Sequence, residues 1–224
     1  MAIKDMELKG KIINFLGDSI TEGVGASMPQ KVYWQLIAQK TGAICNGYGI
    51  SGTRIAKQTV LSPATWDKTD THFATRVSSM DKNADVVVVF GGTNDYGHGD
   101  AAMGNINSIE SNTFYGGMNE LCNKLITYFP RAKIIFMTPM HRIGEDNDWN
   151  SVGIRNVANL SGYVDVIKEV CKKFSFPVID LYGELGINPN NKIQNELFMV
   201  DGVHPNDYGY ERIADFVIQK LKML

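Results

Sequence analysis

Short apolar runs and longer apolar stripes alternate along this chain. The strongest run occupies residues 85–90, where four consecutive valines precede a phenylalanine and a pair of glycines. Four weaker runs occupy residues 12–16, 43–46, 133–138 and 177–180. Because the apolar residues in these runs are continuous rather than alternating, they are typical of parallel strands buried on both faces.

Apolar residues at helical spacing fill the segments between the runs. The stripes begin at Trp34, Phe73, Phe114, Tyr163 and Ile213, and each repeats every three or four residues. Strands that alternate with helices predict a parallel sheet with helices on both faces. We therefore expect an α/β fold, a three-layer α/β/α sandwich of flavodoxin-like type with a five-stranded parallel sheet, and a single domain over residues 1–224.

Loops at the carboxyl ends of the strands are where such folds bind ligands. Two long segments, residues 96–111 and 139–158, carry no clear periodicity and are expected to be loops at this edge. Long loops in compact domains are often functional, so the candidate chemistry is sought there.

The composition excludes several functional classes. Of the 224 residues, 22 are Lys or Arg and 24 are Asp or Glu, so the formal net charge is −2. This balance leaves no basic excess for a nucleic-acid partner. A membrane-spanning helix needs about 20 apolar residues, and the apolar runs are much shorter, so no membrane partner is expected.

Cysteine use and the first residues bear on location. Cys45, Cys122 and Cys171 are widely spaced, with no C-x-x-C pair. An odd number at such spacing favours reduced core thiols over a disulfide framework or a zinc site. Residues 1–11 lack the apolar core of a signal peptide. These features predict a cytoplasmic location.

Polar motifs follow the predicted strands. Gly-Asp-Ser at residues 17–19 comes directly after the first strand, a glycine block at 47–52 after the second, and Gly-Thr-Asn-Asp at 92–95 after the third. Asp-Gly-Val-His at 201–204 precedes the last helix. The first three motifs can meet at one edge of the sheet, and the fourth needs only to fold back to it.

These residue types suit acyl transfer. A serine hydroxyl is a weak nucleophile until a base takes its proton, and the base must be oriented by a third group. Ser19 supplies the hydroxyl, and His204 is the candidate base. Asp201 lies three residues before His204, a spacing at which a carboxylate can reach the imidazole Nδ1–H and leave Nε2 to face Ser19.

Acyl transfer also needs donors for the developing oxyanion. The backbone N–H groups of Ser19 and Gly52 and the side-chain amide of Asn94 are the candidates. Gly52 has no side chain to obstruct a substrate. Together the motifs predict a nucleophile, a base and an oxyanion hole in one cavity.

In these four motifs the sequence resembles the SGNH hydrolases, also called the GDSL esterase/lipase family. The ordered blocks run from residue 17 to 205, and the one departure is Ile20 where the family name expects leucine. The resemblance implies a metal-independent serine esterase without cofactors. It assigns Ser19, His204 and Asp201 to the triad, and Ser19, Gly52 and Asn94 to the oxyanion hole.

The substrate is less closely defined. We expect a small-molecule ester with a short acyl group, such as acetyl on a carbohydrate, because no broad apolar helix is expected at the surface. A lipase or thioesterase acting on longer chains is the alternative. Asp18, His141 and Trp149 are candidate substrate-binding residues. His98 and His141 lie in predicted loops at the same edge and could contact the substrate, although a solvated histidine is the simpler interpretation of each.

Three other interpretations remain open. Residues 47–52 also fit G-x-G-x-x-G, with Asp70 near the distance of the acidic residue in a dinucleotide site. Asp18, Asp95, Asp201 and His204 could instead hold a metal ion, although catalytic zinc usually has several His ligands. A non-catalytic carbohydrate- or nucleotide-binding protein on the same fold would bind without turnover.

Overall fold

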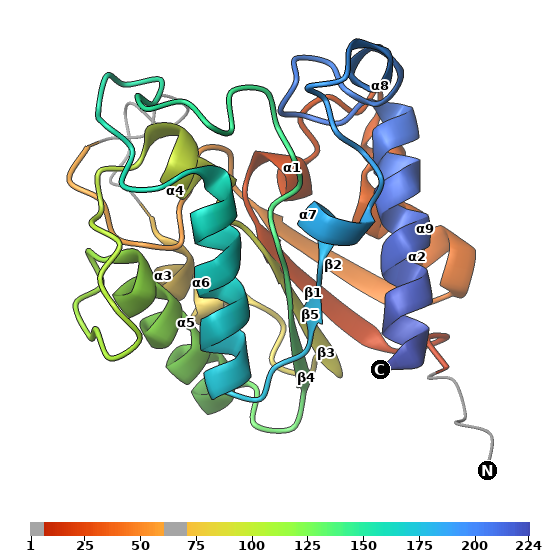
Figure 1. Cartoon of the computed structure of the whole chain (residues 1–224). Coiled ribbons are helices and arrows are strands. Elements are labelled where there is room, and N and C mark those ends of the chain that lie inside the picture. The colour runs from red at the N-terminus through yellow and green to blue at the C-terminus, as the bar shows by residue number, and fades with distance from the viewer. Residues whose placement is uncertain (1–6, 61–70) are drawn as a thin grey trace.

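Five parallel strands form a single sheet in the order β2-β1-β3-β4-β5 (Figure 1). The computed structural model describes residues 7–60 and 71–224. The strands are β1 (Ile12–Gly17), β2 (Ile44–Gly49), β3 (Val86–Phe90), β4 (Lys133–Met137) and β5 (Val178–Ile179). This order is that of flavodoxin-like doubly wound folds, and the predicted fold class is confirmed.

The central strand β3 shows why the apolar runs are continuous. Successive side chains on a strand point to opposite faces. Val86, Val88 and Phe90 belong to the apolar core on one face of the sheet, and Val87 and Val89 belong to the core on the other. All five are buried, because helices cover both faces.

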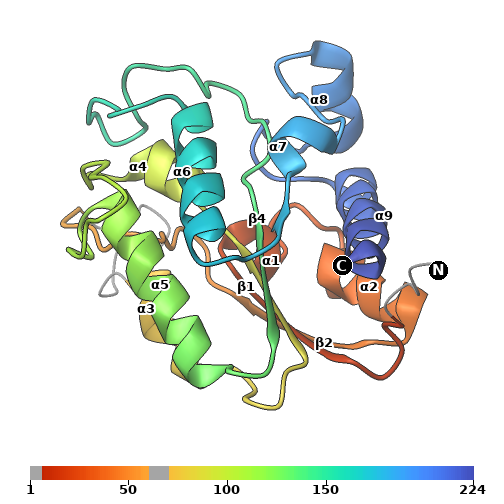
Figure 2. The ribbon, with the colours of Figure 1, turned by 60° about the horizontal axis from the view of Figure 1, so that its bottom comes forward.

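Helices on the two faces complete the three layers (Figure 2). One face carries α2 (Tyr33–Thr41) and α9 (Asp207–Met223), and the other carries α3 (Phe73–Arg76), α5 (Phe114–Tyr128) and α6 (Leu160–Lys173). The shorter elements are α1 (Ser19–Glu22), η1 (Pro29–Lys31), η3 (Val77–Ser79), α4 (Thr93–His98), α7 (Leu181–Glu184) and α8 (Lys192–Phe198).

Two capped helices meet at the carboxyl edge of the sheet. Asp18 is the N-cap of α1, where its side chain accepts the Ile20 N–H at 3.0 Å. Asn206 caps α9 by accepting two backbone N–H groups of its first turn. The buried Tyr210 of α9 donates its hydroxyl to the carbonyls of Ile20 and Val24, at 3.0 and 2.7 Å. This contact joins α9 to α1 and to the turn that follows it.

The second strand is longer than the sequence predicts. The prediction ended it at residue 46, but β2 runs to Gly49 and takes in the first half of the glycine block. A Cβ at Gly47 would lie 2.4 Å from the Trp34 ring, and one at Gly49 would lie 2.1 Å from the Glu22 nitrogen. These glycines are therefore packing positions, where α1 and α2 approach the strand closely.

The first predicted loop, residues 96–111, begins inside a helix. α4 extends to His98, and all six of its residues are buried. Its sequence, TNDYGH, is poor in strong helix formers, so tertiary contacts decide its conformation. Asp95 illustrates this, because its carboxylate accepts the backbone N–H groups of Ile55 and Ala56, both at 2.9 Å.

The cysteines agree with the prediction of reduced thiols. All three are free, with Cys122 and Cys171 buried and Cys45 partly buried. Burial raises the pKa of the Cys45 and Cys171 thiols to about 12, so both stay protonated and unreactive near neutral pH. Among the helices of the described residues, none has the length and apolar character needed to cross a membrane.

Candidate active site

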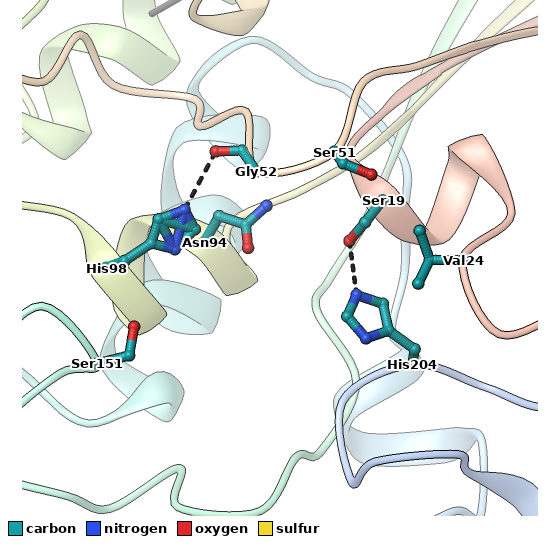
Figure 3. A pocket seen from close by; sticks show the side chains of 8 residues that line it. All are labelled: Ser19, Val24, Ser51, Gly52, Asn94, His98, Ser151 and His204. Carbon is teal, nitrogen blue, oxygen red and sulfur yellow. Dashed lines mark hydrogen bonds between the residues drawn. The ribbon is translucent and has the colours of Figure 1, made fainter. Parts of the chain in front are cut away.

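Four segments distant in sequence meet beyond the carboxyl ends of β1, β2 and β3 (Figure 3). Ser19 opens α1 directly after β1, Gly52 lies in the turn after β2, and Asn94 lies on α4 after β3. His204 comes from the loop between α8 and α9. The structure therefore brings the nucleophile, base and donor candidates to one cavity.

Ser19, His204 and Asp201 form a continuous chain of hydrogen bonds. Ser19 Oγ lies 2.9 Å from His204 Nε2, and His204 Nδ1 lies 2.7 Å from the carboxylate of Asp201. Since a carboxylate only accepts, the proton between the last two belongs to Nδ1. Nε2 of a neutral His204 is then an acceptor for the Ser19 hydroxyl proton, as a general base requires.

Backbone amides keep Asp201 charged. Burial raises the pKa of its carboxyl, but the backbone N–H and the ring of His204 and the backbone N–H of Val203 together bring that pKa below its usual value. One carboxylate oxygen accepts the His204 N–H at 2.7 Å and the Val203 N–H at 2.9 Å. The other oxygen is thereby directed to the imidazole.

The glycine turn presents an N–H group next to Ser19. Thr53 N–H closes the turn on the Ile50 carbonyl at 3.3 Å, and Gly52 has a φ of +72°. A positive φ at this position is typical of a type II turn and favours glycine. Within the described residues the Gly52 N–H has no hydrogen-bond acceptor, so it can donate to a ligand.

Asn94 lies between Gly52 and the far end of the cavity (Figure 3). Its side-chain amide donates to the Thr53 carbonyl at 3.1 Å. An amide nitrogen carries two hydrogens, so this bond orients the group and leaves the second hydrogen for a ligand. The Ser19 N–H at the start of α1 is the third candidate donor, because the first N–H groups of a helix lack intrahelical acceptors.

The cavity around these groups has a volume of about 320 Å³. It is lined by Ser19, Val24, Ser51, Gly52, Asn94, His98, Ser151 and His204. Val24 closes it beside the imidazole, and His98 and Ser151 lie at the opposite end (Figure 3). This volume is at the small end of the range for small-molecule sites, about 300–1,000 Å³.

A family model spans almost all of this arrangement. Residues 15–212 match the GDSL-like Lipase/Acylhydrolase family, and the match includes every residue of the cavity. The chain belongs to this family. The resemblance found in the four motifs is thereby confirmed.

Solved structures share the fold over nearly the whole chain. One crystal structure with 33% sequence identity has a TM-score of 0.84 and covers 98% of this chain and 99% of its own. A protein from Lactobacillus plantarum is 27% identical, with a TM-score of 0.80 and coverage of 96% and 98%. An acetyl xylan esterase is 22% identical, with a TM-score of 0.65 and coverage of 94% and 99%.

A curated relative, an acetylxylan esterase from Xylanibacter ruminicola, is 24% identical over 220 residues. The match covers 92% of this chain and 42% of the relative. The chain therefore spans less than half the length of that protein.

Three residues that the sequence suggested for substrate binding do not line the cavity. Asp18 is buried under α1 as its N-cap, and desolvation raises the pKa of its carboxyl to about 6. His141 Nδ1 lies 2.9 Å from the carboxylate of the buried Glu145, and its ring contacts that of Tyr182 at an interplanar angle of 34°. Trp149 is 61% exposed and is not part of the cavity lining.

The cavity lining also includes His98, which the sequence offered as a possible substrate contact, and three residues that the sequence did not single out: Val24, Ser51 and Ser151. Val24 and Ser51 carry no motif of their own. A signal existed only for His98, which lies four residues after Asn94. At that spacing two side chains share a helix face, but the prediction treated residues 96–111 as a loop.

Two of the open interpretations, the dinucleotide site and the metal site, lack support in the structure. No helix opens after Gly52 in residues 53–60, so the glycine block does not have the context of a dinucleotide site; Asp70 lies outside the described residues. Asp18 and Asp95 bind backbone amides of separate segments. In the described ranges, no three His, Cys, Asp or Glu side chains are grouped to hold a metal ion.

Proposed function

We propose that the chain acts as a single catalytic domain that hydrolyses short acyl esters of carbohydrates, with acetyl as the preferred acyl group. The proposed ester hydrolysis rests on two consecutive hydrogen bonds. One joins Ser19 to His204 at 2.9 Å, and the other joins His204 to Asp201 at 2.7 Å. The geometry is that of a nucleophile, a general base and an orienting carboxylate.

The reaction follows from these contacts. Ser19 Oγ attacks the ester carbonyl carbon while His204 Nε2 takes the hydroxyl proton. The N–H groups of Ser19 and Gly52 and the free amide hydrogen of Asn94 stabilise the oxyanion of the tetrahedral intermediate. The intermediate collapses to an acyl-enzyme, and His204 returns the proton to the departing alcohol. Water, activated by the same imidazole, then releases the acid and restores Ser19.

Two hydroxyl groups in the cavity support a hydroxylated substrate. Ser51 donates its proton to the Glu22 carboxylate, and Ser151 donates to the Gly97 carbonyl at 2.9 Å. With their protons committed, both oxygens can only accept hydrogen bonds from a ligand. A sugar offers several hydroxyl donors, whereas an alkyl chain offers none. The cavity volume and the acetylxylan esterase relative agree with this class.

The test of the catalytic part uses Ser19→Ala. We expect kcat for p-nitrophenyl acetate to fall by about 10⁵-fold or more, with thermal unfolding unchanged, and a fluorophosphonate probe to label the wild type but not the variant. Residual activity near that of the wild type would remove Ser19 from the mechanism. Binding of acetylated sugars without turnover or labelling would favour a non-catalytic binding protein.

The substrate class is tested separately. Rates over C2 to C12 p-nitrophenyl esters should be highest at C2, and acetylated xylo-oligosaccharides should release acetate. Ser151→Ala removes one acceptor and should raise KM for the oligosaccharide more than KM for p-nitrophenyl acetate. An optimum at C8 or longer would favour the lipase or thioesterase alternative.

A further inference from the structure

The short helix α4 holds the backbone segment of residues 52–56, which begins with Gly52. Its side chains and one of its carbonyls bond to consecutive residues of that segment. The contacts are His98 Nε2 to the Gly52 carbonyl at 3.2 Å, Asn94 Nδ2 to the Thr53 carbonyl at 3.1 Å, Arg54 to the His98 carbonyl at 2.9 Å, and the N–H groups of Ile55 and Ala56 to the Asp95 carboxylate at 2.9 Å.

The contact between His98 and Gly52 defines the state of the ring. A carbonyl oxygen can only accept, so Nε2 of His98 carries the proton. Burial, reinforced by the positive charges of Arg54 and Arg142, lowers the pKa of His98 to about 4. The ring is therefore neutral at the pH where an esterase with a histidine base works, and its one N–H is directed to Gly52.

Gly52 is the position of the turn that most needs such a partner. Glycine has more backbone freedom than any other residue, and Gly52 lies between two fixed neighbours. Glu22 accepts the N–H of Ser51 at 2.6 Å on one side, and Asn94 binds the carbonyl of Thr53 on the other. His98 binds the carbonyl of Gly52 itself (Figure 3).

We propose that His98 is a positioning residue, whose Nε2–H holds the Gly52 carbonyl and thereby fixes the direction of the Gly52 N–H toward the oxyanion. This role rests on the proposed function of Gly52 as an oxyanion donor. His98 does not exchange protons with substrate in this role, in contrast to His204. It acts through the glycine turn, and its effect appears only when negative charge develops on the substrate oxygen.

The test compares His98→Met, which keeps the length of the side chain and removes the donor, with His98→Gln, whose amide can donate from nearly the position of Nε2. Losing a whole oxyanion donor typically costs about 10²–10³ in kcat, so we expect His98→Met to lower kcat by about tenfold to a hundredfold. KM should change by less than about threefold, as for an interaction made only in the transition state. His98→Gln should recover most of kcat.

A second readout separates positioning from general structural damage. A boronic acid that adds to Ser19 forms a tetrahedral adduct with an oxyanion, and its affinity should fall in His98→Met by the same factor as kcat. The matched control is His72→Met. His72 is also buried, and its Nε2 lies 3.2 Å from the Glu120 carboxylate, at a position outside the cavity lining. This control should lower the melting temperature and leave the affinity for the boronic acid unchanged.

Two results would overturn the proposal. One is a His98→Met variant with the kcat and boronic-acid affinity of the wild type. The other is independent of any variant: nitrogen-15 NMR of the wild type at pH 6 should show His98 as the neutral Nε2–H tautomer, and a cationic ring or an Nδ1–H tautomer would contradict the hydrogen bond. Failure of the proposed function would appear instead as activity in Ser19→Ala, with the His98 tautomer unaffected.

Discussion

The two sides of the cavity are built in different ways. On the base side, the His204 and Asp201 side chains are 21% and 51% exposed, and the contacts that orient the imidazole lie within the four residues from Asp201 to His204. On the oxyanion side, α4 is buried throughout, and its contacts with the Gly52 segment join residues about 40 positions apart. The base side is thus set by local backbone geometry, whereas the oxyanion side is part of the folded core. Substitutions should therefore separate activity from stability on the first side and combine them on the second.

The largest effect is expected on the base side. His204→Ala removes the general base, and kcat for p-nitrophenyl acetate should fall by about 10⁴- to 10⁶-fold. Because the side chain is partly exposed and its main partners are Ser19 and Asp201, the melting temperature should stay close to that of the wild type. Steady-state kinetics and calorimetry on the same preparation measure both. A large loss of stability would show that the base side is also part of the core.

Asn94→Ala should affect both properties. Losing one oxyanion donor should lower kcat by about 10²–10³-fold, and the Thr53 carbonyl would be left without its partner, at a cost of about 1–3 kcal/mol in the free energy of unfolding. Denaturant unfolding and kinetics give the two numbers.

The matched control for that variant is Asn119→Ala. Asn119 is also buried and donates to the carbonyls of Ile106 and Ser108, at 3.2 and 2.9 Å, outside the cavity. It should lower stability to a similar extent and leave kcat unchanged. An equal loss of kcat in both variants would mean that the effect of Asn94 is only structural.

The last prediction concerns stability alone and compares two carboxyls with opposite pKa shifts. Burial raises the pKa of Asp18 from 3.8 to about 6, whereas that of Asp201 is lowered. Well below pH 4, Asp18 is protonated in both the folded and unfolded states. As the pH rises from 4 to 6, the unfolded state loses its proton first, so Asp18 reduces stability, by up to about 3 kcal/mol above pH 6.

Asp18→Asn removes this penalty and keeps an acceptor for the Ile20 N–H. The variant should be more stable than the wild type at pH 8, and the difference should disappear below pH 4. Asp201→Asn should behave in the opposite way, because its stabilising charge is present above pH 4 and is lost as the pH falls through its lowered pKa. Thermal unfolding between pH 3 and pH 8 measures both, and a constant difference across that range would contradict the assignment to Asp18.

Most of the fold and the reacting groups could be predicted because each depends on short segments. Continuous apolar runs identified the strands, and Ser19, Asn94 and His204 follow or precede regular elements within a few residues. The cavity lining could not be predicted in this way. Val24 reaches it through the turn after α1, where Gly23 has a φ of +109°, and Ser151 through a loop with no periodicity. His98 was expected in a loop rather than on the helix of Asn94, because α4 is helical for tertiary reasons that its own sequence does not express.

The bond from Tyr210 to the carbonyls of Ile20 and Val24 has a consequence for engineering. It ties the helix that follows the histidine loop to the helix that begins with the nucleophile, so this buried phenol, together with the sheet, helps to hold the two reacting groups in place. Anyone transplanting this machinery onto a different scaffold would have to move α1 and α9 together, as one unit with that phenol between them.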